Sequence, residues 1–194
     1  MERLFVVLSA LTISIAYIPF IVGTVKGTVI PNRMSWIIWF IQDGLMFTSA
    51  LCGGIGPATV MPSVWTLGTG IVVVLSFKKG NYAPITGLEK ICLVLSGLGI
   101  LLWATTGSPR LGLIASVSAS CVGGIPTTLK AWKEPWTETI SGWLLMVMGT
   151  IFSSLAIQQW TFDSSFLPIA IGLFQISVVL PLISYKIKKS ITHS

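Results

Sequence analysis

The stretch IPFIVGTVKGTVIPNRMSW, residues 18–36, decides the fold because a related stretch, IPTTLKAWKEPWTETISGW, occupies residues 125–143. Both stretches contain the pattern I-P-x6-K-x9-W without a gap: Ile18-Pro19, Lys26 and Trp36 correspond to Ile125-Pro126, Lys133 and Trp143. Proline and tryptophan are uncommon residues, and each copy has the same context of an apolar run, a short basic loop and a second apolar run. The sequence therefore indicates an internal repeat.

The composition indicates a protein that cannot keep its surface in water. Of the 194 residues, 53% are hydrophobic and only 9% are charged, and the mean hydropathy is +0.88. Soluble domains have about 25% charged residues. These values exclude an ordinary soluble domain, a disordered chain and a disulfide scaffold. They favour an all-α polytopic membrane protein, since a spanning helix satisfies its own backbone and the alternation typical of barrel strands is absent.

Seven apolar runs are long enough to be membrane spans, for which about 20 residues are needed. They cover residues 4–25, 34–54, 58–77, 89–105, 111–129, 139–159 and 166–187. We therefore predict seven transmembrane helices joined by short loops, with no soluble domain.

The repeat predicts how these helices are arranged. Each copy holds three spans, and three spans reverse the direction of the chain across a bilayer. One additional span restores the direction, so both triplets run the same way. We predict a first triple-helix bundle at residues 1–80, a linker helix at 81–107, and a second triple-helix bundle with a short tail at 108–194.

The basic residues predict the orientation. With seven spans, ten lysines and arginines fall on one side of the membrane, whereas only Arg3 and Arg110 fall on the other. Basic loops stay in the cytosol, so we expect the N-terminus outside and the C-terminus in the cytosol. The net charge of +6 is then a topology signal. We expect a lipid bilayer as the partner, and no nucleic acid.

The repeated motifs resemble a known superfamily. The segment Ile18-Pro19, the basic loop and the SWIIW run at 35–39, with the second copy at 124–143, resemble the PQ-loop/SWEET superfamily of 3+1+3 transporters. More narrowly, PNRMSW at 31–36 and GIPT at 124–127 are similar to a group of uncharacterised bacterial membrane proteins with that architecture. The resemblance implies a SWEET-like fold in a bacterial inner membrane. The glutamine of the PQ dipeptide is replaced by Phe20 and Thr127, so sugar specificity is not implied.

Asp43 is the one acid well inside a predicted span. At 1.5 Å per residue it lies about 13 to 15 Å beyond the start of the second span, near the middle of a bilayer. A charged aspartate there costs about 2.5–3.5 kcal/mol. We expect Asp43 to face the bundle interior, as a proton-titratable group or as a polar contact for substrate. The alternative is a hydrogen-bonded residue of helix packing.

Two tryptophans precede Asp43 on adjoining parts of the same helical face. Trp36 and Trp39 lie seven and four residues before it, and indole rings beside an acid suit a ligand with flat, weakly polar faces. The alternative is an interfacial aromatic belt. In the second copy Trp143 and Thr150 occupy the positions of Trp36 and Asp43, which predicts a site symmetric in shape and asymmetric in charge.

Other polar and proline residues complete the predicted site. We expect Gln175 on the seventh span to face Thr69 on the third; simple helix–helix hydrogen bonding is the alternative. Pro19 and Pro126 interrupt equivalent helices and are candidate hinges for a gating motion, with Tyr17 beside the pathway. The alternative reading of both prolines is static kinks.

Catalytic and metal chemistry is not indicated. Cys52, Cys92 and Cys121 lie in three different spans without metal or redox spacing, and the one histidine, His193, is in the tail. Phosphate-binding glycine motifs are absent. We expect no enzyme activity, no catalytic residue, no metal and no cofactor.

The sequence therefore predicts a membrane transporter for a small neutral or weakly polar solute, sugar-like molecules included. It would work by alternating access, either as a facilitator or coupled to protons through Asp43. The alternative is a non-transporting scaffold or receptor that binds a lipid, a pigment or a partner protein with the same fold. The sequence allows a homo-oligomer and does not fix the oligomeric state.

Overall fold

The computed structural model describes residues 2–52, 57–79, 85–106 and 109–192. These residues form seven α-helices, one short 3-10 turn and no strand. The helices are α1 (Glu2–Lys26), α2 (Arg33–Cys52), α3 (Pro57–Lys79), α4 (Gly87–Thr106), α5 (Pro109–Lys133), α6 (Ile140–Leu155) and α7 (Phe162–Thr192), with the 3-10 turn at Pro135–Thr137. The predicted all-α class and the seven helices are confirmed. The predicted bundle boundaries, at 80–81 and 107–108, lie outside the described residues.

The two copies of the repeat begin their second helix with equivalent caps. The Asn32 side chain accepts a hydrogen bond from the backbone N–H of Ser35 at 3.1 Å, and the Thr139 hydroxyl accepts one from Gly142 at 3.3 Å. Asn32 and Thr139 correspond in the alignment of the two copies. Each cap satisfies a helix N–H group that has no partner within the helix. The copies thus share local structure as well as sequence.

A left-handed glycine ends the first helix. Gly27 has φ of 73°, a conformation that costs glycine little and other residues more. The N–H of Thr28 donates to the Gly23 carbonyl at 2.9 Å and that of Gly27 to the Thr24 carbonyl at 3.1 Å, which together form a Schellman motif. The chain can therefore turn sharply into α2.

Six of the helices form a closed ring of packed neighbours around the centre of the molecule. Around the ring, α1 packs on α3, α3 on α2, α2 on α5, α5 on α7, α7 on α6, and α6 on α1. Exchanging α1, α2 and α3 with α5, α6 and α7 leaves this set of neighbours unchanged. Helix α4 lies outside the ring, against α5 and α2.

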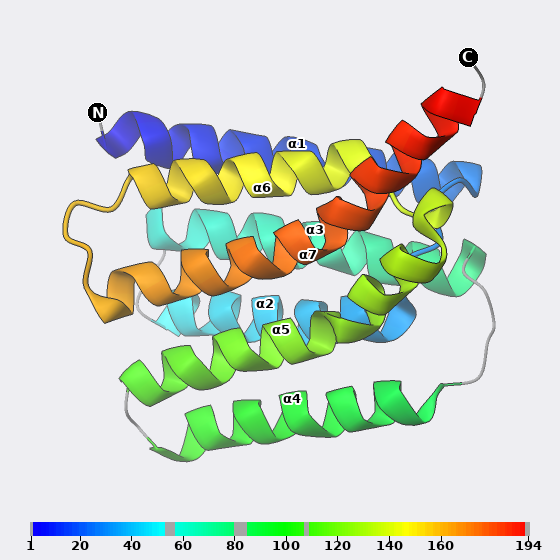
Figure 1. Cartoon of the computed structure of the whole chain (residues 1–194). Coiled ribbons are helices and arrows are strands. Elements are labelled where there is room, and N and C mark those ends of the chain that lie inside the picture. Colours follow the sequence, from blue (N-terminus) through cyan, green and yellow to red (C-terminus); the bar gives the residue numbers. More distant parts are fainter. Residues whose placement is uncertain (1, 53–56, 80–84, 107–108, 193–194) are drawn as a thin grey trace.

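Positive charge collects at one end of the ring. Successive helices alternate in direction, so the C-terminal ends of α1, α3, α5 and α7 lie together, opposite the N-terminus (Figure 1). We call this end the basic end. It carries Lys26, Arg33, Lys78, Lys79, Lys90, Lys130, Lys133, Lys186, Lys188 and Lys189. The opposite end carries Arg3 and Arg110.

The outer surface of the helices is apolar. Leu67 on α3, Ile91 and Leu101 on α4, and Leu173 on α7 are each more than half exposed, and large exposed apolar side chains recur on every helix. Within the described residues, two helices are long and apolar enough to cross a membrane, α1 and α7. The helices Pro62–Lys78 and Ile140–Leu155 are apolar but shorter.

Glycines allow α1 to approach its neighbours closely. A Cβ atom at Gly149 of α6 would lie 2.4 Å from Ile13 Cγ1, and one at Gly142 would lie 2.7 Å from the Phe20 ring. On the other side of α1, a Cβ at Gly68 of α3 would lie 2.6 Å from the Tyr17 ring. These three contacts fix the distance of α1 from α6 and α3.

We predict that Gly149→Ala destabilises the protein although alanine is the better helix former. The new methyl would overlap the buried, branched Ile13, and overpacking of this kind costs about 1–3 kcal/mol. Gly97→Ala on α4 is the matched control, since nothing lies within 4 Å of that position. There the helix gains up to about 1 kcal/mol of propensity. Thermal unfolding of the purified protein measures both, and equal effects at the two sites would contradict the prediction.

Candidate functional site

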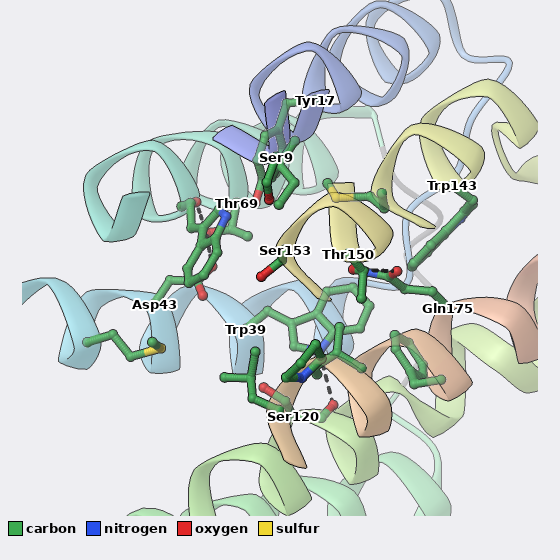
Figure 2. A pocket seen from close by; sticks show the side chains of 18 of the residues that line it. Ser9, Tyr17, Trp39, Asp43, Thr69, Ser120, Trp143, Thr150, Ser153 and Gln175 are labelled. Carbon is green, nitrogen blue, oxygen red and sulfur yellow. Dashed lines mark hydrogen bonds between the residues drawn. The ribbon is translucent and has the colours of Figure 1, made fainter. Parts of the chain in front are cut away.

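A cavity of about 320 Å³ lies inside the ring of six helices. All seven residues predicted to bind substrate line it, and so does Tyr17 (Figure 2). The seven are Trp36, Trp39, Asp43, Thr69, Trp143, Thr150 and Gln175. Such a volume is at the lower end of the range for ligand pockets, about 300–1,000 Å³. The structure therefore brings residues of α1, α2, α3, α6 and α7 together around a space for a small molecule.

Asp43 contacts Thr69 in the first half of the chain. The Thr69 hydroxyl lies 3.1 Å from Asp43 Oδ2, and the same hydroxyl lies 2.8 Å from the Trp65 carbonyl oxygen. Thr69 is buried, and Tyr17 on the neighbouring helix α1 also lines this part of the cavity. Asp43 thus reaches the cavity from α2 with one hydroxyl beside it.

The second half has an equivalent pair. The Thr150 hydroxyl on α6 donates to Gln175 Oε1 on α7 at 2.9 Å. Thr150 is the counterpart of Asp43, and the pair joins the second and third helices of its half, as Asp43 and Thr69 do. Figure 2 shows the two pairs on opposite sides, with Ser153 and Trp39 between them. Gln175 and Thr69 line one cavity, but each bonds within its own half, not to the other.

Five aromatic rings close the cavity toward the basic end. This aromatic cluster consists of Phe20, Trp36, Trp39, Trp143 and Phe174. Phe20 packs edge-on against Trp36 and Trp143, with ring centroids 5.2 and 5.4 Å apart. Trp36 is 3% and Trp143 is 4% exposed. Both rings are therefore core residues at the closed end of the cavity, and they do not form an aromatic belt on the surface.

A buried ion pair lies directly behind the aromatic cluster. Lys130 Nζ donates to Glu138 Oε1 at 2.7 Å, and the indole N–H of Trp143 donates to Glu138 Oε2 at 3.0 Å. The Glu138 side chain is 1% exposed and that of Lys130 is 16% exposed. Lys130 also donates to the carbonyl of Ile30 in the α1–α2 connection. The pair therefore ties the two copies together at the basic end.

A backbone hydrogen bond adds to this closure. The N–H of Ile30 donates to the carbonyl of Thr137 at 2.9 Å. The same shift that aligns Trp36 with Trp143 aligns Ile30 with Thr137, so the bond joins equivalent positions of the two copies. The connections α1–α2 and α5–α6 thus meet where the copies are related to each other.

The cavity extends in the other direction, away from the basic end. Its lining reaches Val6 near the start of α1, Ala156 at the end of α6 and Leu167 near the start of α7. Val6 is 49% exposed. The space is thus closed by rings and an ion pair at one end and bounded by small or half-exposed apolar side chains at the other.

The prolines give a second matched pair that the sequence analysis missed. Pro19 and Pro126 lie inside α1 and α5, which continue through them, and neither lines the cavity. Pro62 in α3 and Pro168 in α7 are also inside helices and lie seven residues before Thr69 and Gln175. Pro168 lines the cavity. All four prolines lie in the first or third helix of a half.

Several other lining or supporting residues were missed. Ser9, Trp65 and Ser153 line the cavity. Gln42 is buried and contacts α5, where it accepts a hydrogen bond from the Ser120 hydroxyl. Glu138 was overlooked because an acid in the connection between two apolar runs looks like a solvated residue; its place five residues before Trp143 was the available signal.

The described residues contain no cluster that would hold a metal ion, counting groups of three or more His, Cys, Asp or Glu. Cys92 and Cys121 are free thiols. Searches against protein-family models, curated proteins and solved structures find no match for this chain. Among the described residues, the site is an apolar and aromatic chamber with one carboxyl group, and it is closed at one end.

We predict that Glu138→Gln destabilises the protein by about 3 kcal/mol or more, because Lys130 loses its anion in a largely buried position. Glutamine keeps an acceptor for Trp143, so the loss reports the ion pair. Asp163→Asn is the control, because it breaks the exposed ion pair with Arg110. The side chain of Arg110 is 60% exposed and that of Asp163 is 58% exposed. This substitution should cost at most about 1 kcal/mol.

The measurement is thermal or denaturant unfolding of each variant. A double variant, Lys130→Met with Glu138→Gln, should recover most of the loss, since no unpaired charge is then buried. Equal destabilisation by Glu138→Gln and Asp163→Asn would contradict the prediction.

Proposed function

We propose that this chain is a polytopic membrane transporter for a small organic solute, of the 3+1+3 kind, that works by alternating access. The observation that carries the proposal is the central cavity. It lies between two sets of three helices with equivalent neighbours, is closed at one end by a cluster built from both sets, and extends toward the other. A resemblance to the PQ-loop/SWEET superfamily accords with this arrangement.

The apolar exterior supports insertion of the whole helix ring in a bilayer. Large exposed apolar side chains recur on all seven helices, and α4, outside the ring, exposes them on several sides. Patches this extensive mark membrane or protein contact surfaces. In lipid they would face acyl chains, and the cavity with its carboxyl group would remain inside.

The distribution of cations supports an orientation. The basic end carries ten of the twelve lysines and arginines, and cytosolic ends of membrane proteins are rich in these residues. We therefore place the basic end in the cytosol and the N-terminus outside, in a bacterial inner membrane. In this orientation the cavity is closed to the cytosol and extends toward the outside.

Alternating access requires that the closed end open while the other end closes. The aromatic cluster and the Lys130–Glu138 pair connect the two halves at the basic end, so their separation would open that end. Prolines inside α1, α3, α5 and α7 remove backbone hydrogen bonds at matched places in the two halves. The proposed motion is a rocking of the halves at these points.

The orientation predicts which single cysteines a membrane-impermeant maleimide can reach. In a background with the three native cysteines replaced, Arg3→Cys should be labelled on intact cells. Lys189→Cys should be labelled only after permeabilisation. Both positions are exposed in the structure, so access depends on the membrane alone. The reverse pattern would contradict the orientation, and labelling of neither site in the membrane fraction would contradict insertion.

Transport itself is tested by solute flux in proteoliposomes. A panel of labelled sugars, amines and amino acids should reveal at least one solute that equilibrates faster than in protein-free vesicles. Asp43→Asn should abolish this flux or make it insensitive to pH, with folding retained, because Asp43 is the one charged group among the described residues that line the cavity. Asp163→Asn, the same substitution at an exposed site, should leave flux unchanged.

A non-transporting scaffold gives a different result in the same experiment. Neither the parent protein nor Asp43→Asn would then move any solute, and a lipid, pigment or partner protein would co-purify with the chain. That outcome would overturn the transport proposal.

A further inference from the structure

The described lining of the cavity has a negatively charged side chain and no positively charged one. Among the described residues that line it, Asp43 is the only charged one, and no lysine, arginine or histidine contributes. Tyr17 on α1 is the titratable group that faces Asp43; α3, α5, α6 and α7 supply no charged lining residue. An anionic solute would find no partner here, because burial of an unpaired charge is costly.

Several hydrogen-bond donors of the lining are in use within the protein. A polyol such as a sugar binds through many hydrogen bonds to side chains, so free donors are what it would need. The committed donors are Ser9 Oγ to the Gly149 carbonyl at 2.8 Å, Thr150 Oγ1 to Gln175 Oε1 at 2.9 Å, Trp39 Nε1 to the Ser120 carbonyl at 3.1 Å, and Trp143 Nε1 to Glu138 Oε2 at 3.0 Å. These four donors are not available to a neutral polyol.

Asp43 itself has too few donors for a carboxylate. The Thr69 hydroxyl is its hydrogen-bond neighbour, at 3.1 Å, but that hydroxyl has one proton and lies closer, at 2.8 Å, to the Trp65 carbonyl. A hydroxyl proton cannot serve both acceptors. The carboxyl group therefore needs a positive partner in the cavity: either a proton of its own, which it can donate to Thr69 Oγ1, or a cation.

Aromatic rings surround the same space. Seven of the 22 lining residues are Phe, Tyr or Trp. Around Trp39 the rings meet edge to face, at interplanar angles of 78° to Trp36 and 73° to Trp143, so each contact covers one face of one ring and leaves the other faces to their surroundings. Ring faces that are not covered by another ring attract organic cations, and quaternary ammonium groups bind in aromatic cages of this kind.

From these observations we infer that the solute of this cavity is a small organic cation, an alkylated or quaternary amine, held between the Asp43 carboxylate and the faces of the surrounding aromatic rings. As a statement about transport, the inference rests on the function proposed above, and it replaces the expectation of a neutral or sugar-like solute. Because one carboxylate neutralises one charge, the cation and a proton exclude each other. Binding of the cation releases the proton of Asp43 to water, and protonation of Asp43 releases the cation.

The test compares two ligands of the same shape. Choline carries a quaternary nitrogen, and 3,3-dimethyl-1-butanol has carbon in its place. Calorimetric titration of the purified full-length protein in detergent should show choline binding about tenfold or more tightly than the neutral isostere. Acidification should weaken choline binding and leave the isostere unaffected. Asp43→Asn should remove the preference, and Asp163→Asn should keep it.

The wild-type comparison keeps the inference falsifiable even where a variant fails to fold. Equal affinity for choline and the neutral isostere would overturn the inference, and so would binding of glucose without binding of choline. If some solute were still transported into proteoliposomes, the transport proposal would stand. Preferential choline binding without flux of any solute would support the assignment of the site and overturn transport.

Discussion

The structure depends on the packing of Phe20 between Trp36 and Trp143. Phe20 belongs to α1, whereas the two tryptophans begin α2 and α6 at equivalent positions of the two sequence copies. The contact therefore connects the halves at the point where each copy turns into its second helix. Gly142 makes room for the Phe20 ring, and Glu138 holds the Trp143 indole from behind. This cluster is the layer that closes the central space directly, and the ion pair and the connections lie behind it.

Much of the arrangement could be predicted from the sequence. The length of each apolar run predicts a helix, and the alignment of Ile18-Pro19 with Ile125-Pro126 predicts equivalent neighbours for the two sets of helices. The rarity of Asp43 in an apolar run, and the spacing of Trp36 and Trp39 before it, indicated residues that the structure places at one cavity. These features can be recognised in the sequence because a residue that is uncommon in an apolar chain needs a physical reason to be there.

The rotation of the helices was not predictable in the same way. Each helix is apolar on nearly all sides, so the hydrophobic pattern does not say which side faces the centre. The sequence therefore led us to expect that Gln175 faces Thr69. In the structure, each of them bonds to the second helix of its own half. Trp65 and Pro168 were overlooked for the same reason. Glu138 was missed because it lies in the connection between two helices, where the apolar pattern gives no sign of burial; its partners are Lys130 and Trp143.

The difference between Asp43 and Thr150 has an evolutionary consequence. A homodimer of identical three-helix subunits would bring either two carboxyl groups or none to its centre, because every residue would appear twice. Two acids side by side repel each other when ionised, and an empty centre offers no charge at all. Joining both modules in one polypeptide lets one keep the acid and the other replace it with a hydroxyl. Divergence of the two modules thus allows a single negative charge at the middle of a two-fold architecture.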